Sequence, residues 1–303
     1  MSTTAPEVPR SRARARKLYT VDNPKKSPVL TIVVAVFTIY CLLPLVWLII
    51  NATKSQGDFV STFGLSFGSH FALFDNIAEV FTYDDGIFSR WLLNTLMYVL
   101  VGATVSTFLA ALGGYALAKL PFRGKRAFLF IVLGSISVPG IAIAIPQFLL
   151  FAQLGLTNTP WAVLIPSFLN PFGLYLMWVS ASDAIPQDIL EAARIDGAGE
   201  IRTFAQVGVR MMIPATVTVF LFSFVSIWNN YFLPLIMLND PKWYPLTIGI
   251  SIWNKLGNTA GNSEMLQNLV ITSSLLTIIP LLIAFISLQR FWQSGLAVGA
   301  VKG

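Results

Sequence analysis

The stretch Glu191-Ala-Ala-Arg-Ile-Asp-Gly-Ala198 is a polar island in a very apolar chain. Pro186 precedes it and can occupy the first position of a helix, where no backbone N–H is required. Gly197 can end that helix by adopting the left-handed conformation. The spacing therefore predicts a short helix over residues 186–196. Its apolar face holds residues at helical spacing, namely Ile185, Ile189, Leu190 and Ala193.

The charges of this stretch suit the predicted helix. Asp188 and Glu191 lie toward its N-terminus and Arg194 toward its C-terminus, which is the arrangement that the helix dipole favours. A second short helix is predicted from Gly199 to about Val209. Its apolar face would hold Ile201, Phe204 and Ala205. An ordinary amphipathic surface helix is the alternative interpretation.

The composition indicates a polytopic membrane protein. Hydrophobic residues make up 55% of the 303 residues, charged residues only 11%, and the mean hydropathy is +0.70. A soluble domain carries about 25% charged residues. The net charge of +6 is concentrated in an N-terminal arm and beside apolar segments, so it does not indicate binding to nucleic acid. Cys41 is the only cysteine, which excludes a disulfide within the chain.

Six apolar segments are long enough to cross a bilayer, which takes ~20 residues in a helix. The fold class is therefore all-α, with an arm over residues 1–27, expected to be disordered and cytoplasmic, and a transmembrane domain over 28–303. No cleavable signal peptide is expected, because the first apolar segment is too long. The predicted spans are 29–50, 91–118, 128–151, 161–179, 212–238 and 269–291.

The distribution of Lys and Arg predicts that both termini are cytoplasmic. Cationic residues are enriched in the cytoplasmic loops of membrane proteins. With both ends inside, sixteen of the twenty Lys and Arg fall on the cytoplasmic side. The four on the outer side are Lys54, Arg90, Lys242 and Lys255. This orientation places the loop over about 183–210 in the cytoplasm.

The sequence predicts neither a catalytic nor a metal site. His70 is the only histidine, and no Gly-x4-Gly-Lys-Ser/Thr loop that could hold ATP phosphates is present. The predicted spans contain essentially no Asp, Glu, Lys or Arg, whereas ion-coupled carriers usually need such groups within the membrane. We therefore expect no enzyme activity, no cofactor bound by this chain, and a neutral solute driven by an outside source of energy.

Amide and aromatic side chains are the polar features of the spans. Amides hydrogen-bond hydroxyl groups, and aromatic rings stack on sugar rings, while a buried amide without a partner is costly. Hydrogen bonds between helices and anchoring at the membrane interface are the structural alternatives. The candidates for a translocation path are Asn94, Asn170, Trp228, Asn229, Asn230 and Tyr231.

The polar stretch resembles the EAA loop of membrane subunits of ATP-binding cassette importers. The chain departs from the family pattern at Arg210, where the family has a proline. The residues that match the pattern are Glu191, Ala192, Ala193, Asp196, Gly197, Ala198, Phe204 and Pro214. The resemblance implies the type I importer permease fold and a loop that docks in a separate ATPase subunit. That ATPase dimer, and not this chain, would use ATP and Mg.

Three further motifs resemble the sugar branch of these importers, in particular the six-span partner of maltose-type heterodimers. They are the W-x-x-N-T run 91–95, the W-N-x-[FY]-x-x-P-L run 228–235 and the terminal Gly-Ala-Val-Lys-Gly. The resemblance covers residues 28–303. It implies a second permease subunit, an extracytoplasmic binding protein that contacts Gly257, Asn258, Gly261 and Asn262, and an approach of Lys302 to the ATPase.

These features predict a multi-pass permease subunit in the cytoplasmic (inner) membrane, in contact with the lipid bilayer. Its substrate would be a mono- or oligosaccharide. Another neutral or polyol-like solute, such as glycerol phosphate, is the alternative within the same class. A stand-alone channel or secondary carrier is the alternative from another class, and a membrane-embedded enzyme would need catalytic groups that the sequence lacks.

Overall fold

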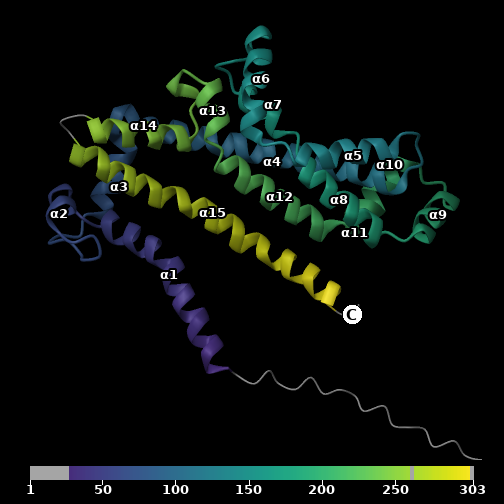
Figure 1. Cartoon of the computed structure of the whole chain (residues 1–303), viewed down its shortest axis with the longest axis horizontal. Coiled ribbons are helices and arrows are strands. Elements are labelled where there is room, and N and C mark those ends of the chain that lie inside the picture. The colour runs from purple at the N-terminus through teal and green to yellow at the C-terminus, as the bar shows by residue number, and fades with distance from the viewer. Residues whose placement is uncertain (1–26, 260–262, 301–303) are drawn as a thin grey trace, which may run out of the picture. The chain divides into compact units, whose positions relative to one another are not determined.

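The computed structural model describes residues 27–259 and 263–300, which form helices joined by loops (Figure 1). All but the last residue of the predicted N-terminal arm therefore lies outside the described residues. The helices are α1 Pro28–Ala52, α2 Gln56–Ser61, α3 Leu73–Thr82, η1 Tyr83–Gly86, α4 Ile87–Lys119, α5 Lys125–Ile136, α6 Gly140–Gln153, α7 Trp161–Ser167, α8 Pro171–Ala184, α9 Gln187–Ile195, α10 Glu200–Thr203, the π-helix η2 Phe204–Gly208, α11 Val209–Met211, α12 Ile213–Trp228, α13 Phe232–Met237, η3 Pro241–Trp243, α14 Leu246–Thr259 and α15 Ser263–Ala300.

The chain divides into two compact units, residues 1–46 and residues 47–303. The described part of the first unit is the beginning of α1, in which every residue from 28 to 46 is exposed. This segment is apolar on all sides and therefore lacks the polar face that a helix on the surface of a soluble protein has. A helix that is apolar on all sides suits an apolar environment such as a lipid bilayer.

Four helical stretches are long and apolar enough to cross a membrane, or six if each of two bent pairs counts as one span. The all-helical prediction is confirmed, whereas the exact count of six spans and the orientation stay predictions. The third predicted span is not continuous, because α5 and α6 meet at an angle of 102°. Pro139 lies at this break and lacks the N–H that a continuous helix would need.

The fourth and fifth predicted spans are also interrupted. Pro171 follows the break between α7 and α8, and residues 229–231 separate α12 from α13. The second predicted span is longer than expected, because α4 begins at Ile87 and α3 precedes it through a kink at Asp84 and Asp85. These two residues have φ of 50° and 54°, which a continuous helix excludes.

Glycines allow two close contacts between helices of the second unit. A Cβ added to Gly114 of α4 would lie 2.6 Å from the backbone of Met177 in α8. At the other end of α4, a Cβ added to Gly249 of α14 would lie 2.1 Å from the Trp91 ring. Small residues permit such contacts, which membrane helices use in place of a hydrophobic driving force. Both pairs of helices are therefore fixed by a glycine.

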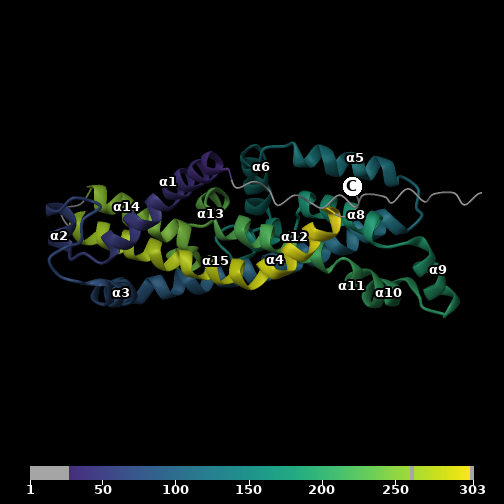
Figure 2. The ribbon, with the colours of Figure 1, turned by 90° about the horizontal axis from the view of Figure 1, so that it is seen from below.

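The two ends of the second unit carry different elements. Both views place α9 and α10 at one end, and α2, α3 and α14 at the opposite end (Figures 1 and 2). Because α4 runs between these ends, one helix contributes to both. The polar stretch that the sequence singled out therefore lies at one extremity of the helix bundle.

We expect Gly114→Ala to lower the free energy of unfolding by about 1–3 kcal/mol, because the added methyl group must force α4 away from the α8 backbone. Thermal unfolding in mild detergent measures this change. Gly134→Ala in α5 is the matched control, because nothing lies within 4 Å of its added Cβ. Equal stability of the two variants would contradict the proposed packing constraint.

Candidate functional site

The polar stretch folds into α9 and the turn after it, much as the sequence predicts. The helix α9 begins at Gln187, one residue later than predicted. Pro186 is its N-cap and has an extended backbone. At the other end, Gly197 has φ +79°, and its N–H donates to the carbonyl of Arg194. Ala198 N–H donates to the carbonyl of Ala193 at 2.9 Å. The left-handed glycine that the sequence predicts at this position is confirmed.

An ion pair closes this turn. The guanidinium of Arg194 at the end of α9 lies 2.9 Å from the carboxylate of Glu200 at the start of α10. The pair is exposed to solvent, so its contribution to stability is small, about 0–1 kcal/mol. It links the end of α9 to the start of α10 across the turn. Glu200 escaped the sequence analysis, although opposite charges on either side of an Asp-Gly turn are a readable signal.

The outer face of this loop is partly apolar. Ile195 and Ile201 are each 86% exposed, on either side of the turn. The prediction that Ile201 and Ala205 form an apolar inner face is therefore wrong. The chain makes a π-helix at 204–208 in place of a regular second helix, which changes the angular spacing of the side chains.

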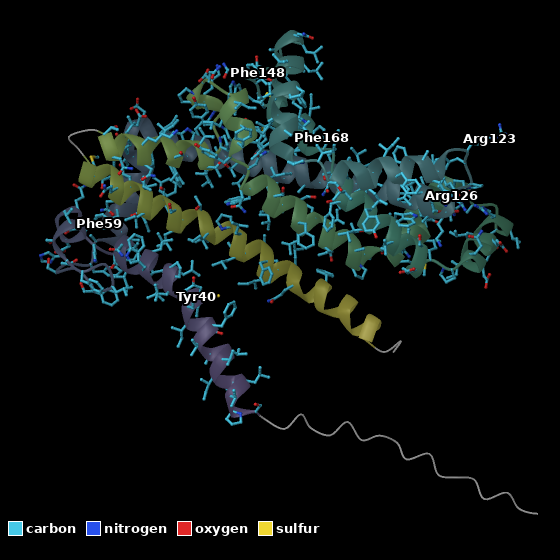
Figure 3. All side chains as sticks on the ribbon, viewed as in Figure 1. Tyr40, Phe59, Arg123, Arg126, Phe148 and Phe168 are labelled. Carbon is cyan, nitrogen blue, oxygen red and sulfur yellow. The ribbon has the colours of Figure 1, made fainter. Side chains whose placement is uncertain are left out.

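The residues of the EAA pattern lie mainly on the exposed side. Glu191, Ala192, Asp196 and Gly197 are exposed, and Ala193 and Ala198 are half-buried. Lys302 lies outside the described residues. Figure 3 shows two basic residues, Arg123 and Arg126, at the end of the second unit that carries α9 and α10.

The inner face of the loop belongs to the core of the membrane helices. Leu190 of α9 and Phe204 of the π-helix are buried in one apolar cluster with Tyr115 of α4 and Met177 of α8. Ile185, at the end of α8, joins the same cluster. Packed interiors transmit displacement because they have no room to absorb it. Leu190 and Phe204 therefore tie the loop to α4 and α8 through a continuous packed interior.

A second candidate site is a cavity of about 770 Å³ between α4, α5, α6, α7, α8, α12 and α13. No Asp, Glu, Lys or Arg is among its lining residues. Its polar side chains are Ser106, Ser135, Gln147, Ser167, Asn170, Ser223, Ser226 and Asn230. Residues at the ends of helices also line it, namely Gly140 at the start of α6, Pro166 near the end of α7 and Pro171 at the start of α8.

Two of the six residues predicted for a translocation path line this cavity. Asn170 also caps α8, where its Oδ1 accepts the N–H of Gly173 at 2.8 Å and its Nδ2 donates to Ser223 Oγ at 2.9 Å. Asn230 lies at the end of α12, with a side chain that has no hydrogen-bond partner among the described residues. The sequence analysis missed Gln147, although a glutamine beside a proline within an apolar span is a signal for it.

Asn94 lies away from the cavity and has a structural role. Side chains of α4 donate hydrogen bonds to every carbonyl oxygen of residues 241–244. Asn94 Nδ2 contributes two of them, to Lys242 at 2.8 Å and to Tyr244 at 3.0 Å. In the same loop, hydrogen bonds from Lys242 lower the pKa of Asp240. In this structure the Asn94 amide is therefore committed to this loop, and its place on a translocation path stays a prediction.

The remaining three predicted residues also lie elsewhere than on the cavity wall. Trp228 is buried and stacks on Phe224 with ring centroids 5.8 Å apart. Asn229 donates to a carbonyl of its own helix at 2.9 Å. The Tyr231 hydroxyl lies 3.2 Å from Ser251 Oγ of α14. In this structure these side chains make contacts within and between helices, which is the alternative role that the sequence analysis gave for the polar residues of the spans.

The predicted contact loop for a binding protein is largely helical. Gly257 and Asn258 belong to the last turns of α14, where Gly257 is buried and Asn258 is exposed. Gly261 and Asn262 lie outside the described residues. Within residues 27–259 and 263–300, no three His, Cys, Asp or Glu side chains are grouped as a metal site would require.

We expect Gly197→Val to weaken the loop by about 1–2 kcal/mol, because a β-branched residue resists a φ of +79°. Nothing lies within 4 Å of an added Cβ, so the effect comes from the backbone and not from a clash. The measurement is the yield of complex with the ATPase that the EAA-loop resemblance implies, at equal expression of the chain. Gly199→Ala is the matched control, since Gly199 has φ −70° and equally open surroundings. Equal yields would contradict the turn argument.

Comparison with known proteins identifies the class of this fold. Residues 107–296 match the family "binding-protein-dependent transport system inner membrane component". The arabinooligosaccharide transport permease AraQ of Halalkalibacterium halodurans is 29% identical over 93% of this chain and 98% of its own length. The lactose transport permease LacG of Rhizobium radiobacter is 29% identical over 86% of this chain and 91% of its own length.

Two further relatives extend the comparison. The diacetylchitobiose uptake permease NgcG of Streptomyces coelicolor is 26% identical over 88% of this chain and 86% of its own. A solved bacterial importer of the acidic polysaccharide alginate superposes with a TM-score of 0.78, covering 87% of this chain and 95% of that one. At 24% identity, this likeness concerns the fold alone. The chain is a multi-pass cell-membrane protein that belongs to the family of binding-protein-dependent transport system inner membrane components.

Proposed function

We propose that this chain is the permease subunit of an ATP-driven importer that receives a neutral mono- or oligosaccharide from an extracytoplasmic binding protein. The cavity of about 770 Å³ carries this proposal, because its polar lining is entirely uncharged. Its size falls in the usual range for small-molecule sites, about 300–1,000 Å³. The relatives named above for arabinooligosaccharides, lactose and diacetylchitobiose support a carbohydrate as the substrate.

Three side chains on the cavity wall are free to bind sugar hydroxyls. Gln147, Ser226 and Asn230 have no side-chain hydrogen-bond partner among the described residues. Each amide offers both a donor and an acceptor, and so does a hydroxyl group. Phe172 and Phe222 add rings to the wall, on which the apolar face of a sugar could lie. This combination suits a polyhydroxylated neutral ligand.

The loop over α9 and α10 supplies the coupling to ATP. Its outer face, with Ile195 and Ile201, fits an apolar cleft on an ATPase subunit, while Glu191 and the Arg194–Glu200 pair add polar contacts at the rim. Closure of the ATPase dimer would push α9, and the cluster around Leu190 would carry that push to α4 and α8. Nucleotide thereby shifts a two-state equilibrium of the membrane helices.

The remaining partners follow from the same scheme. A second permease subunit would complete the translocation path, and the apolar surface of α1 over residues 28–46 suits burial against such a subunit or lipid. A binding protein would deliver the solute at the end that carries α14. ATP and Mg would be bound by the ATPase subunits.

The alternatives make different demands on the cavity. Glycerol phosphate would require a cationic group to balance its phosphate, and the lining residues include none. A stand-alone channel or secondary carrier would move solute along a gradient without a second protein. Reconstitution in proteoliposomes separates these possibilities.

The test is uptake of a radiolabelled neutral oligosaccharide by proteoliposomes that hold this chain, its ATPase and a second permease. The proposal expects uptake only when both ATP and binding protein are present. Uptake by this chain alone, without ATP, would overturn the proposal in favour of a channel or carrier. Transport of a phosphorylated polyol in preference to every neutral sugar would overturn the substrate class.

We expect Asn230→Ala and Gln147→Ala each to raise the sugar concentration at half-maximal uptake about 2- to 10-fold, since one hydrogen bond contributes about 0.5–1.5 kcal/mol. Co-purification with the ATPase should not change. Asn229→Ala is the matched control, because that amide bonds to its own helix and lies off the cavity. If all three variants transport like the wild type, these amides serve only in packing.

We expect Ile195→Ser and Ile201→Ser each to reduce binding of the ATPase by about 10-fold, because burial of such a side chain contributes about 1.5–3 kcal/mol. The stability of the isolated chain should be unchanged, since both side chains are exposed. Pull-down with a tagged ATPase measures the effect. Val60→Ser, an exposed apolar position on α2, is the control that should retain binding.

A further inference from the structure

Tyr115 lies where the proposed coupling loop, about residues 183–210, meets the membrane helices. It is on α4 and only 3% exposed, within the apolar cluster that holds Leu190 and Phe204. Its ring meets the Phe204 ring edge-on, with centroids 5.1 Å apart and planes at 61°. Because Phe204 is the first residue of the π-helix, Tyr115 contacts the least regular part of the loop.

The loop is shaped to admit this ring. A Cβ added to Gly208, the last residue of the π-helix, would lie 3.1 Å from Tyr115 Cε2 and 3.2 Å from Cδ2. Any other residue there would press on the ring. The Val209 N–H donates to the Phe204 carbonyl, which is the wide hydrogen bond of a π turn. Such turns are frequent at functional sites, and here one is built around a tyrosine.

The Tyr115 hydroxyl has no hydrogen-bond partner among the described residues, although it is buried. Among those residues, only one other buried side-chain oxygen shares this condition, Thr107 Oγ1 on the same helix. A buried tyrosine hydroxyl usually finds a partner, because leaving it unpaired costs free energy. Glu200 begins α10, one helical turn before Phe204, whose ring contacts Tyr115. The Glu200 carboxylate is thus an acceptor in the same loop, and it lies outside hydrogen-bond reach of the Tyr115 hydroxyl in this conformation.

We propose that Tyr115 is a positioning residue that senses the conformation of the coupling loop. In this state its hydroxyl is buried and unpaired, whereas in the alternate state of the transport cycle the loop moves and the hydroxyl donates to the Glu200 carboxylate. The hydroxyl then favours the alternate state, since it is satisfied only there. This inference rests on the proposed function, because it assumes that the loop moves with ATP.

The test replaces Tyr115 with phenylalanine, which keeps the ring against Phe204 and removes only the unpaired oxygen. We expect the isolated variant to unfold at a higher temperature than the wild type, because a buried unsatisfied group is gone. In the assembled importer, we expect ATP-driven uptake to fall about 5-fold or more, since the alternate state loses a hydrogen bond. Thermal unfolding in detergent and uptake by proteoliposomes give the two measurements.

Thr107→Val is the matched control, because it removes the other unpaired hydroxyl, eight residues earlier on α4 and within the same spanning helix. It should raise the unfolding temperature as Tyr115→Phe does, but leave ATP-driven uptake at the wild-type level. A double-mutant cycle of Tyr115→Phe with Glu200→Ala identifies the acceptor. The two substitutions should be non-additive in uptake, because either one alone removes the same bond.

The outcomes separate this inference from the proposed function. If the wild-type importer takes up no sugar with ATP, the proposed function is overturned. The unfolding temperature of the isolated Tyr115→Phe variant still tests whether the buried hydroxyl is unpaired, because that measurement needs no transport. Wild-type uptake by Tyr115→Phe, in an importer that is active, overturns the sensing role. A lower unfolding temperature for Tyr115→Phe also overturns it, because the hydroxyl would then be paired already in this conformation. Additive effects in the cycle overturn the assignment of Glu200.

Discussion

The contact between α4 and α8 is the constraint on which the rest of this structure depends. Gly114 brings the two helices to backbone contact, and the cluster that begins beside it holds Tyr115, Met177 and Leu190. This arrangement seats the coupling loop at one end of the helices. Further along the same two helices, Ser106 of α4 and Asn170 at the start of α8 both contact Ser223 of α12, and all three line the cavity. One packing interaction therefore positions both candidate sites.

Breaks in the helices give the cavity its chemistry. A continuous apolar helix offers no free backbone groups and few polar side chains to a membrane interior. Here the chain bends sharply near Pro139, and the helical hydrogen bonding is interrupted before Pro171, so that polar Asn170 lies where a helix begins again. Irregular backbone in a membrane protein is tolerated where it lines a cavity. The bends are thus the feature that converts apolar spans into a polar, uncharged site.

Sequence patterns were most reliable where the reason was local. The left-handed Gly197 and the helix before it follow from hydrogen bonding within about ten residues, so the printed sequence was sufficient. The apolar face of the next segment was wrong at Ile201, which is 86% exposed, because the spacing of apolar residues does not say which side of a one-turn helix packs against α4. Asn94 was placed on the path for its chemistry, but its partners lie about 150 residues away, at 242 and 244.

The sequence by itself determined the membrane class, the helical content and the position of the short polar helix with its glycine turn, because composition and short-range spacing carry these properties. The tertiary structure alone decided which polar residues share a cavity. Asn170, Asn230 and Gln147 come from three separate segments, and their meeting depends on where the helices bend and which backbones touch. It also decided that Tyr115 faces the coupling loop, since long-range packing between α4 and the loop has no signature in local spacing.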